Sequence, residues 1–95
     1  MITRMWEATL DPAYADEVAA ALVAELGTWT AREVYRSLDR PSHLVVISHW
    51  PDEAALAAYA GRQWRTDPAA ELAALPPAAH PTGPARVWHF TSVTT

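Results

Sequence analysis

Residues 43–61, HLVVISHWPDEAALAAYAG, decide the fold because they place a buried strand directly before a helix. The first part, HLVVISHW, is rich in β-branched and aliphatic side chains on both of its alternating faces, as a central strand should be. Pro51 cannot continue a strand, and Asp52 is a favoured N-cap residue. We therefore expect a strand over 43–50 and a helix over 53–60.

The flanking segments repeat this strand and helix pattern. Alternating apolar residues predict further strands over 2–10, 30–38 and 85–93. Asp11 as N-cap, Pro12 at the first helical position and Gly27 as the stop predict a first helix. Its core-facing residues recur every four positions: Tyr14, Val18, Leu22 and Leu26.

A second helical piece is expected after Gly61. Asp67 would cap it, Pro68 would take its first position, and Pro76–Pro77 would close it. The element order is then β-α-β-β-α-β, which predicts an α+β, ferredoxin-like fold with a four-stranded antiparallel sheet and helices on one face. The 95 residues form a single domain, 1–95. Because strand 43–50 is apolar on both faces, we expect a homodimer in which a second sheet covers the first.

Composition excludes several classes of function. The chain has no Cys, its basic residues are all Arg, and it has only 3 Gly. Thiol chemistry, a lysine Schiff base and glycine-rich nucleotide loops are therefore excluded, and we expect neither a metal nor a cofactor. A net charge of −4 with scattered Arg argues against nucleic acid or a membrane surface as partner. Without a membrane-length apolar run or a signal-peptide pattern, a cytoplasmic protein is expected.

Several short motifs together resemble the antibiotic-biosynthesis monooxygenase family, within the dimeric α+β barrel superfamily. The most specific is the passage from the central strand through Trp50 to the aromatic-Ala-Gly step at Tyr59–Gly61. The motifs that carry the resemblance are Arg4-Met-Trp6, Arg32-Glu-Val34-Tyr35, Ser48-His-Trp50-Pro-Asp-Glu-Ala-Ala-Leu56, Tyr59-Ala-Gly61 and Trp88-His89-Phe90.

The resemblance implies a cleft between sheet and helices, and the family includes cofactor-free oxygenases of aromatic polyketides and haem-degrading enzymes. Both kinds are similar in using an Asn beside a Trp, but this chain contains no Asn. Val46 stands where the polyketide oxygenases would carry it. Ala69 stands where a haem-degrading relative would carry a His. Haem degradation is therefore not expected, and the usual oxygenase constellation is incomplete.

His89 and Arg4 are the candidate catalytic residues. His89 lies between Trp88 and Phe90, a setting that can shift its pKa and suit a general base. Arg4 lies on a strand that should be central, where a guanidinium is costly unless it is paired or faces a cleft. The alternatives are a structural His bonded to backbone, and an Arg stacked on Trp6 and paired with an acid.

Four aromatic residues are candidates for substrate binding. Trp50 shares a face with Val46 and is either a cleft residue or a core residue, whereas the neighbouring His49 points to the opposite face. Tyr59 and Trp64 flank Gly61. The predicted substrate-binding set is Trp6, Trp50, Tyr59 and Trp64.

These residues lead to an expected function. A small aromatic or polyketide-like substrate would lie in the cleft, His89 would remove a proton, Arg4 would stabilise the anion, and the ring would react with O₂. The alternatives are a cyclase or isomerase that uses the same groups, and a non-catalytic dimeric binding protein.

Overall fold

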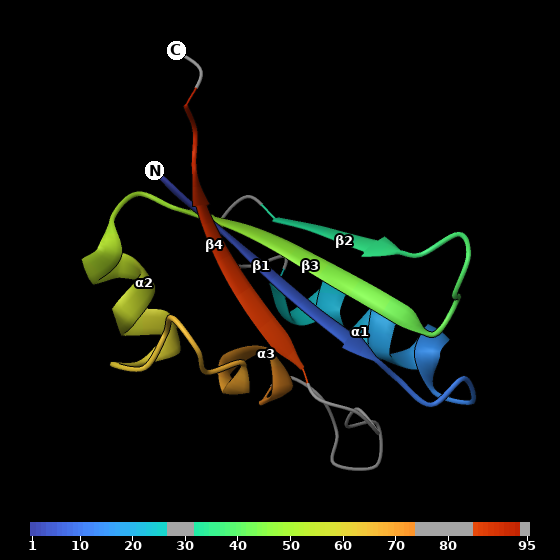
Figure 1. Ribbon diagram of the computed structural model, residues 1–95. Coiled ribbons are helices and arrows are strands. Elements are labelled where there is room, and N and C mark those ends of the chain that lie inside the picture. The colour runs from blue at the N-terminus through green and yellow to red at the C-terminus, as the bar shows by residue number, and fades with distance from the viewer. Residues whose placement is uncertain (27–31, 74–84, 94–95) are drawn as a thin grey trace.

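The structure is a computed structural model that describes residues 1–26, 32–73 and 85–93. The elements follow one another as in Figure 1: β1 (Ile2–Thr9), α1 (Ala15–Leu26), β2 (Arg32–Arg36), β3 (His43–Trp50), α2 (Glu53–Ala60), α3 (Ala69–Leu72) and β4 (Arg86–Thr91).

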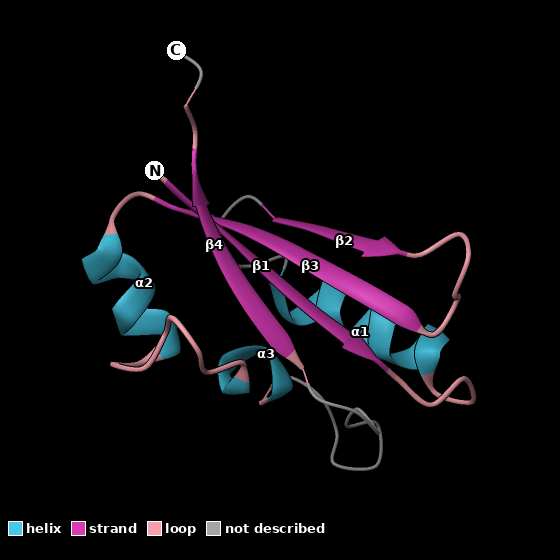
Figure 2. Cartoon of the chain, in the orientation of Figure 1, coloured by secondary structure: helices cyan, strands magenta, loops and turns pink. Residues whose placement is uncertain are grey.

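The four strands form one sheet in the order β2-β3-β1-β4, and every neighbouring pair is antiparallel. β1 and β3 are therefore the inner strands, while β2 and β4 lie at the edges. The two longer helices lie at different places: α1 lies beneath β1 and β3, and α2 lies beside the end of β3 (Figure 2). The predicted α+β fold with a four-stranded antiparallel sheet is confirmed.

The inner strands bury every second residue, as the alternation of side chains along a strand requires. The buried side chains form two apolar clusters on the helix-bearing face. The first packs against α1 and contains Trp6, Ala8, Leu10, Val18, Leu22, Leu44 and Val46. The second packs against α2 and contains Trp50, Leu56 and Trp64. Arg4, Ser48 and Glu71 are buried polar residues of the same face.

The first helix begins later than its sequence signals predict. Asp11 accepts hydrogen bonds from the Ala13 and Tyr14 N–H groups, which makes residues 11–14 a turn, and α1 starts only at Ala15. Tyr14 is consequently exposed and does not belong to the core stripe, whereas Val18 and Leu22 do. The side chain of Leu26 and the predicted stop at Gly27 lie outside the described residues.

Of the two helices after β3, α2 has the N-cap and the end that the sequence predicts, whereas α3 does not. The Asp52 carboxylate accepts from the Ala55 N–H at 2.8 Å and so caps α2. Gly61 ends α2 with φ +87°, a conformation that favours glycine. Asp67 accepts from the Ala69 N–H at 2.9 Å, but the N-cap position of α3 is Pro68 and its first helical residue is Ala69. The predicted start, with Asp67 as N-cap and Pro68 in the first position, was therefore one residue too early, and α3 ends after one turn, shorter than predicted.

The second face of the sheet carries apolar side chains that no described helix covers. Tyr35, Trp88 and Phe90 are exposed on this face. They alternate along their strands with residues that face the helices, such as Val34 and His89. None of the helices in the described ranges has the length and apolarity needed to cross a membrane.

Candidate functional site

The site is built around Arg4, which lies in the middle of the sheet. The strand register places it opposite Ser48 of β3 on one side and opposite His89 of β4 on the other. All three side chains belong to the helix-bearing face, and Arg4 is fully buried. A buried guanidinium needs a partner for each of its donors, because an unpaired charge in this position is costly.

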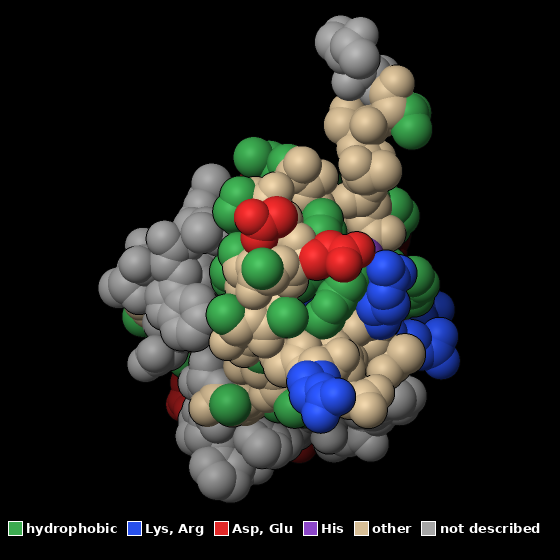
Figure 3. Space-filling model, turned by 90° about the vertical axis from the view of Figure 1, so that its left-hand side faces the viewer, with side chains coloured by type: hydrophobic (Ala, Val, Ile, Leu, Met, Phe, Trp, Pro, Cys, Tyr) green, Lys and Arg blue, Asp and Glu red, His purple; other side chains and the backbone are tan. Residues whose placement is uncertain are grey.

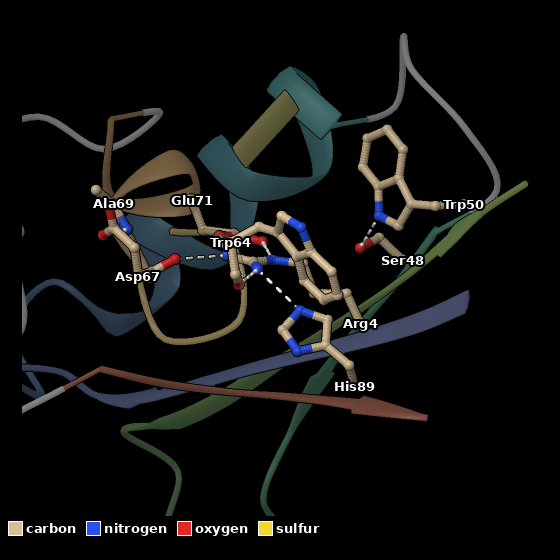
Figure 4. A network of polar contacts seen from close by, with 8 residues as sticks. All are labelled: Arg4, Ser48, Trp50, Trp64, Asp67, Ala69, Glu71 and His89. Atoms are coloured by element: carbon tan, nitrogen blue, oxygen red, sulfur yellow. Dashed lines mark hydrogen bonds and ion pairs between the residues drawn. The ribbon is translucent and has the colours of Figure 1, made fainter. Parts of the chain in front are cut away.

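Each N–H group of Arg4 has an acceptor (Figure 4). Nε and Nη2 donate to the two carboxylate oxygens of Glu71 at 2.8 and 3.0 Å, a bidentate ion pair. Nη2 also donates to the Asp67 carbonyl at 2.9 Å. Nη1 donates to the Trp64 carbonyl at 2.7 Å and to Nε2 of His89 at 3.0 Å. Arg4 thus ties the segment from Trp64 to Glu71 onto the sheet.

These contacts decide what Arg4 can do. A guanidinium has five N–H donors and no acceptor, and here all of its donors are used inside the protein. Arg4 therefore has no donor left for a substrate anion in this arrangement. The ion pair with Glu71 agrees with the alternative in which Arg4 is paired with an acid.

The contact with Arg4 also determines the form of His89. Because Arg can only donate, Nε2 of His89 must be the acceptor, and the ring is neutral with its proton on Nδ1. Burial, followed by the nearby charges of Arg4 and Arg65, lowers the pKa of His89 from 6.5 to about 4. At neutral pH this imidazole offers an N–H donor, and its lone pair is already engaged.

The lowered pKa predicts how stability depends on pH. In the unfolded chain His89 takes up a proton near pH 6.5, but in the folded protein only near pH 4. Between these values the unfolded state binds more protons, so the free energy of unfolding falls as the pH falls. His89→Gln retains an acceptor for Arg4 but does not titrate. We therefore expect its free energy of unfolding to fall less over this pH range than that of the wild type. Urea midpoints at several pH values would measure this, and equal slopes for both proteins would contradict it.

A hollow of about 230 Å³ opens beside His89 at the edge of β4. Its apolar walls come from Ile2, Trp64 and Phe90, and its polar groups belong to Glu53, Arg65, His89 and Thr91. The hollow lies between the outer edge of the sheet and the start of α2, so residues far apart in the sequence line it together. An apolar slot with a few polar groups is the usual form of a small-molecule site.

The charged groups of this hollow are exposed at its mouth. Glu53 and Arg65 form a long ion pair of 3.5 Å between Oε1 and Nη2. The Arg65 guanidinium also lies 4.5 Å from the centre of the Trp64 ring, a cation–π contact. Trp64 in turn meets His89 edge-on, with 4.7 Å between ring centres. A carboxylate, a guanidinium and a neutral imidazole thus surround one apolar surface.

Only part of the predicted aromatic set lines this hollow. Trp64 does, but Trp6 is fully buried in the cluster under α1. Trp50 donates its indole N–H to the Ser48 hydroxyl at 3.0 Å, and its ring stacks on that of Tyr59 with 4.6 Å between ring centres. Among the predicted residues, the structure thus brings His89 and Trp64 together at the hollow and places Arg4 directly behind His89.

Sequence reasoning missed Glu53, Arg65 and Glu71. Glu53 has the signature of an acid in the first turn of a helix, which does not distinguish a functional carboxylate from a helix-stabilising one. Arg65 lies in an irregular segment without periodicity. Glu71 could have been sought as the acid that a buried Arg on a central strand requires.

The remaining described histidines lie on the other face of the sheet. His49 contacts Thr3 at 3.2 Å and Glu33 at 3.3 Å, and His43 contacts Glu7 at 3.2 Å. The predicted outward direction of His49 is confirmed. Within the described ranges, no group of three or more His, Asp or Glu side chains could hold a metal ion.

The chain matches no family model and no curated protein. Solved structures are similar over its whole length. An antibiotic biosynthesis monooxygenase matches with a TM-score of 0.72 and 20% identity, covering 99% of this chain and 100% of its own. A Deinococcus radiodurans protein described as such an enzyme matches with a TM-score of 0.72 and 14% identity, covering 100% of this chain and 95% of its own. A Nitrosomonas europaea protein described in the same way matches with a TM-score of 0.69 and 10% identity, covering 99% of this chain and 100% of its own.

At these identities the likeness shows the fold. The chain folds as antibiotic biosynthesis monooxygenase structures do, across all of its length. The resemblance that the sequence motifs indicated is thereby confirmed for the fold, while substrate and reaction depend on the site itself.

Proposed function

We propose that this protein is a cofactor-independent enzyme that oxygenates a small hydroxylated aromatic ring in the hollow beside His89. The observation that carries the proposal is the meeting of three groups at one apolar slot: the Glu53 carboxylate, the Arg65 guanidinium and the His89 ring. The similar solved structures described as monooxygenases support the reaction class.

The size of the hollow supports a ligand of one or two rings. About 230 Å³ exceeds the roughly 150 Å³ of a cavity that holds benzene, but falls below the roughly 300 Å³ at which drug-sized pockets begin. The ring would lie against Ile2 and Trp64. Part of a larger polyketide would have to lie outside this hollow.

The contacts support catalytic roles for these residues that differ from the roles predicted from the sequence. Glu53 is the carboxylate that can accept the proton of a ring hydroxyl, because the Nε2 lone pair of His89 is engaged by Arg4. Nδ1–H of His89 and the guanidinium of Arg65 would then stabilise the phenolate oxygen. Arg4 is a positioning residue, since its hydrogen bond orients the His89 ring and its charge adds to burial in keeping the ring neutral.

The oxygenation step needs no external reductant. The phenolate of a hydroquinone gives an electron to O₂, and the radical pair combines at a ring carbon that carries hydrogen. The resulting hydroperoxide loses water and leaves a carbonyl, so one oxygen atom enters the ring, the other becomes water, and the ring supplies all the electrons. The product is a hydroxyquinone.

Oxygen uptake tests the proposal. Purified protein without added cofactor would be supplied with hydroquinones of one and two rings, and oxygen consumption and hydroxyquinone formation would be followed. We expect Glu53→Gln to lower the rate about a hundredfold, the usual effect of removing a catalytic base. Glu17→Gln, which removes an exposed acid of α1, is the matched control and should retain the wild-type rate.

Two outcomes would contradict parts of the proposal. Equal rates for wild type and Glu53→Gln would remove Glu53 from the reaction. No uptake, with tryptophan fluorescence still reporting that the ring binds, would rule out the oxygenase and leave a cyclase, an isomerase or a binding protein.

A homodimer is part of the same proposal. The uncovered face of the sheet carries exposed apolar groups such as Tyr35, which lines neither hollow and which a second copy of the sheet would remove from water. Light scattering on the samples used for oxygen uptake would show whether the protein has the mass of two chains.

A further inference from the structure

A second hollow adjoins the first along β4. It measures about 360 Å³ and is lined by Arg65, Thr66, Ala85, Arg86, Val87 and Trp88. Arg65 lines both hollows, and both lie along β4 at the outer edge of the sheet.

The two hollows differ in charge. Glu53 balances Arg65 in the first, but no Asp or Glu is among the residues that line the second. Arg86 makes no ion pair with the described residues, and its cross-strand neighbour Glu7 contacts His43. Arg65 and Arg86 therefore both line one hollow of a chain whose net charge is −4. Figure 3 shows basic side chains gathered at one edge of the face that carries α2.

Other features of this hollow suit an anion attached to a ring. The Thr66 hydroxyl can donate a hydrogen bond, and Val87 offers an apolar surface. β4 is an edge strand, and such a strand directs unpaired backbone N–H groups outward. A guanidinium binds a carboxylate through a pair of charge-assisted hydrogen bonds.

We infer that the ligand of the first hollow carries a carboxylate, which extends past Arg65 and is bound between Arg65 and Arg86 in the second. This inference rests on the proposed function, since it assumes that a ring occupies the first hollow. It narrows the substrate class to hydroxylated aromatic acids whose hydroxyl and carboxylate lie at opposite ends.

Calorimetric titration with matched probes tests the inference. The first probe is the hydroxynaphthoate whose hydroxyl and carboxylate lie at opposite ends of the fused rings. The second is its carboxamide, which has the same shape without the charge. We expect the carboxylate to bind about tenfold more tightly, and added salt to reduce the difference. Arg86→Gln should abolish the difference, whereas Arg62→Gln, an exposed Arg that lines neither hollow, should retain it.

The outcomes separate this inference from the proposed function. Equal binding of both probes to the wild type would overturn the carboxylate site and leave ring binding intact. A preference for the carboxylate that persists in Arg86→Gln would overturn its assignment to the second hollow. If neither probe binds while hydroquinones are still oxygenated, the inference alone is wrong, and if oxygen uptake fails as well, both proposals are wrong.

Discussion

Arg4→Met is expected to lower the free energy of unfolding by about 3–5 kcal/mol, the cost of breaking a buried ion pair by removing one partner. Glu71 is 1% exposed and would keep a buried carboxylate without its bidentate partner. The Trp64 and Asp67 carbonyls would lose their donor in the same substitution. Urea denaturation followed by circular dichroism measures the change.

Two further variants give this prediction its control. In Arg4→Met/Glu71→Leu both charges are gone, so a large part of the stability should return. Arg36→Met removes the exposed pair with Asp16, and its effect should stay within about 1 kcal/mol. Because Arg4 acts on His89, its loss should also raise the pKa of His89 toward 6.5, measurable by NMR. A loss no larger than that of Arg36→Met would show that the buried pair does not hold the fold.

Trp6→Ala is expected to cost about 3–5 kcal/mol, the range for removing a large aromatic side chain from a core. Trp6 is fully buried against α1, in the cluster that contains Val18 and Leu22. Its indole N–H has no hydrogen-bond partner in the described structure, so it contributes bulk and no polar contact. Trp6→Phe should therefore cost much less than Trp6→Ala. Thermal unfolding of the two variants compares them.

Ligand binding distinguishes this core role from the predicted substrate role of Trp6. Trp6→Phe should bind aromatic probes as the wild type does, whereas Trp64→Leu should weaken binding because Trp64 lines the hollow. Weak binding in a folded Trp6→Phe protein would return Trp6 to the substrate site.

Local patterns predicted the strands well and the helix ends less well. β1 and β3 match their predicted ranges closely because alternation and Pro51 are strong local signals. The start of α1 was predicted too early, since Asp11 caps a turn rather than the helix. A residue such as Asp11 can accept hydrogen bonds from the N–H groups of a turn as well as from those of a helix. The local sequence therefore does not fix the residue at which the helix begins.

The candidate site was predicted in part. His89 was singled out as a histidine between aromatic residues on a strand, and the structure places it at the hollow with Trp64. Trp50 was grouped with them because it shares a strand face with Val46, and Tyr59 because it flanks Gly61 together with Trp64. They instead stack on each other over α2, because side chains that lie close in sequence can face different neighbours.

By itself the sequence determined the order of elements, the buried face of each inner strand and the chemistry that the chain cannot perform. These properties follow from periodicity and residue type, which are local. Only the tertiary structure decided that Glu71 neutralises Arg4, that burial and Arg4 together keep His89 uncharged, and that Glu53 and Arg65 line the same hollow. Ion pairing depends on distance in space, and the antiparallel sheet brings together residues that are more than sixty positions apart in the chain.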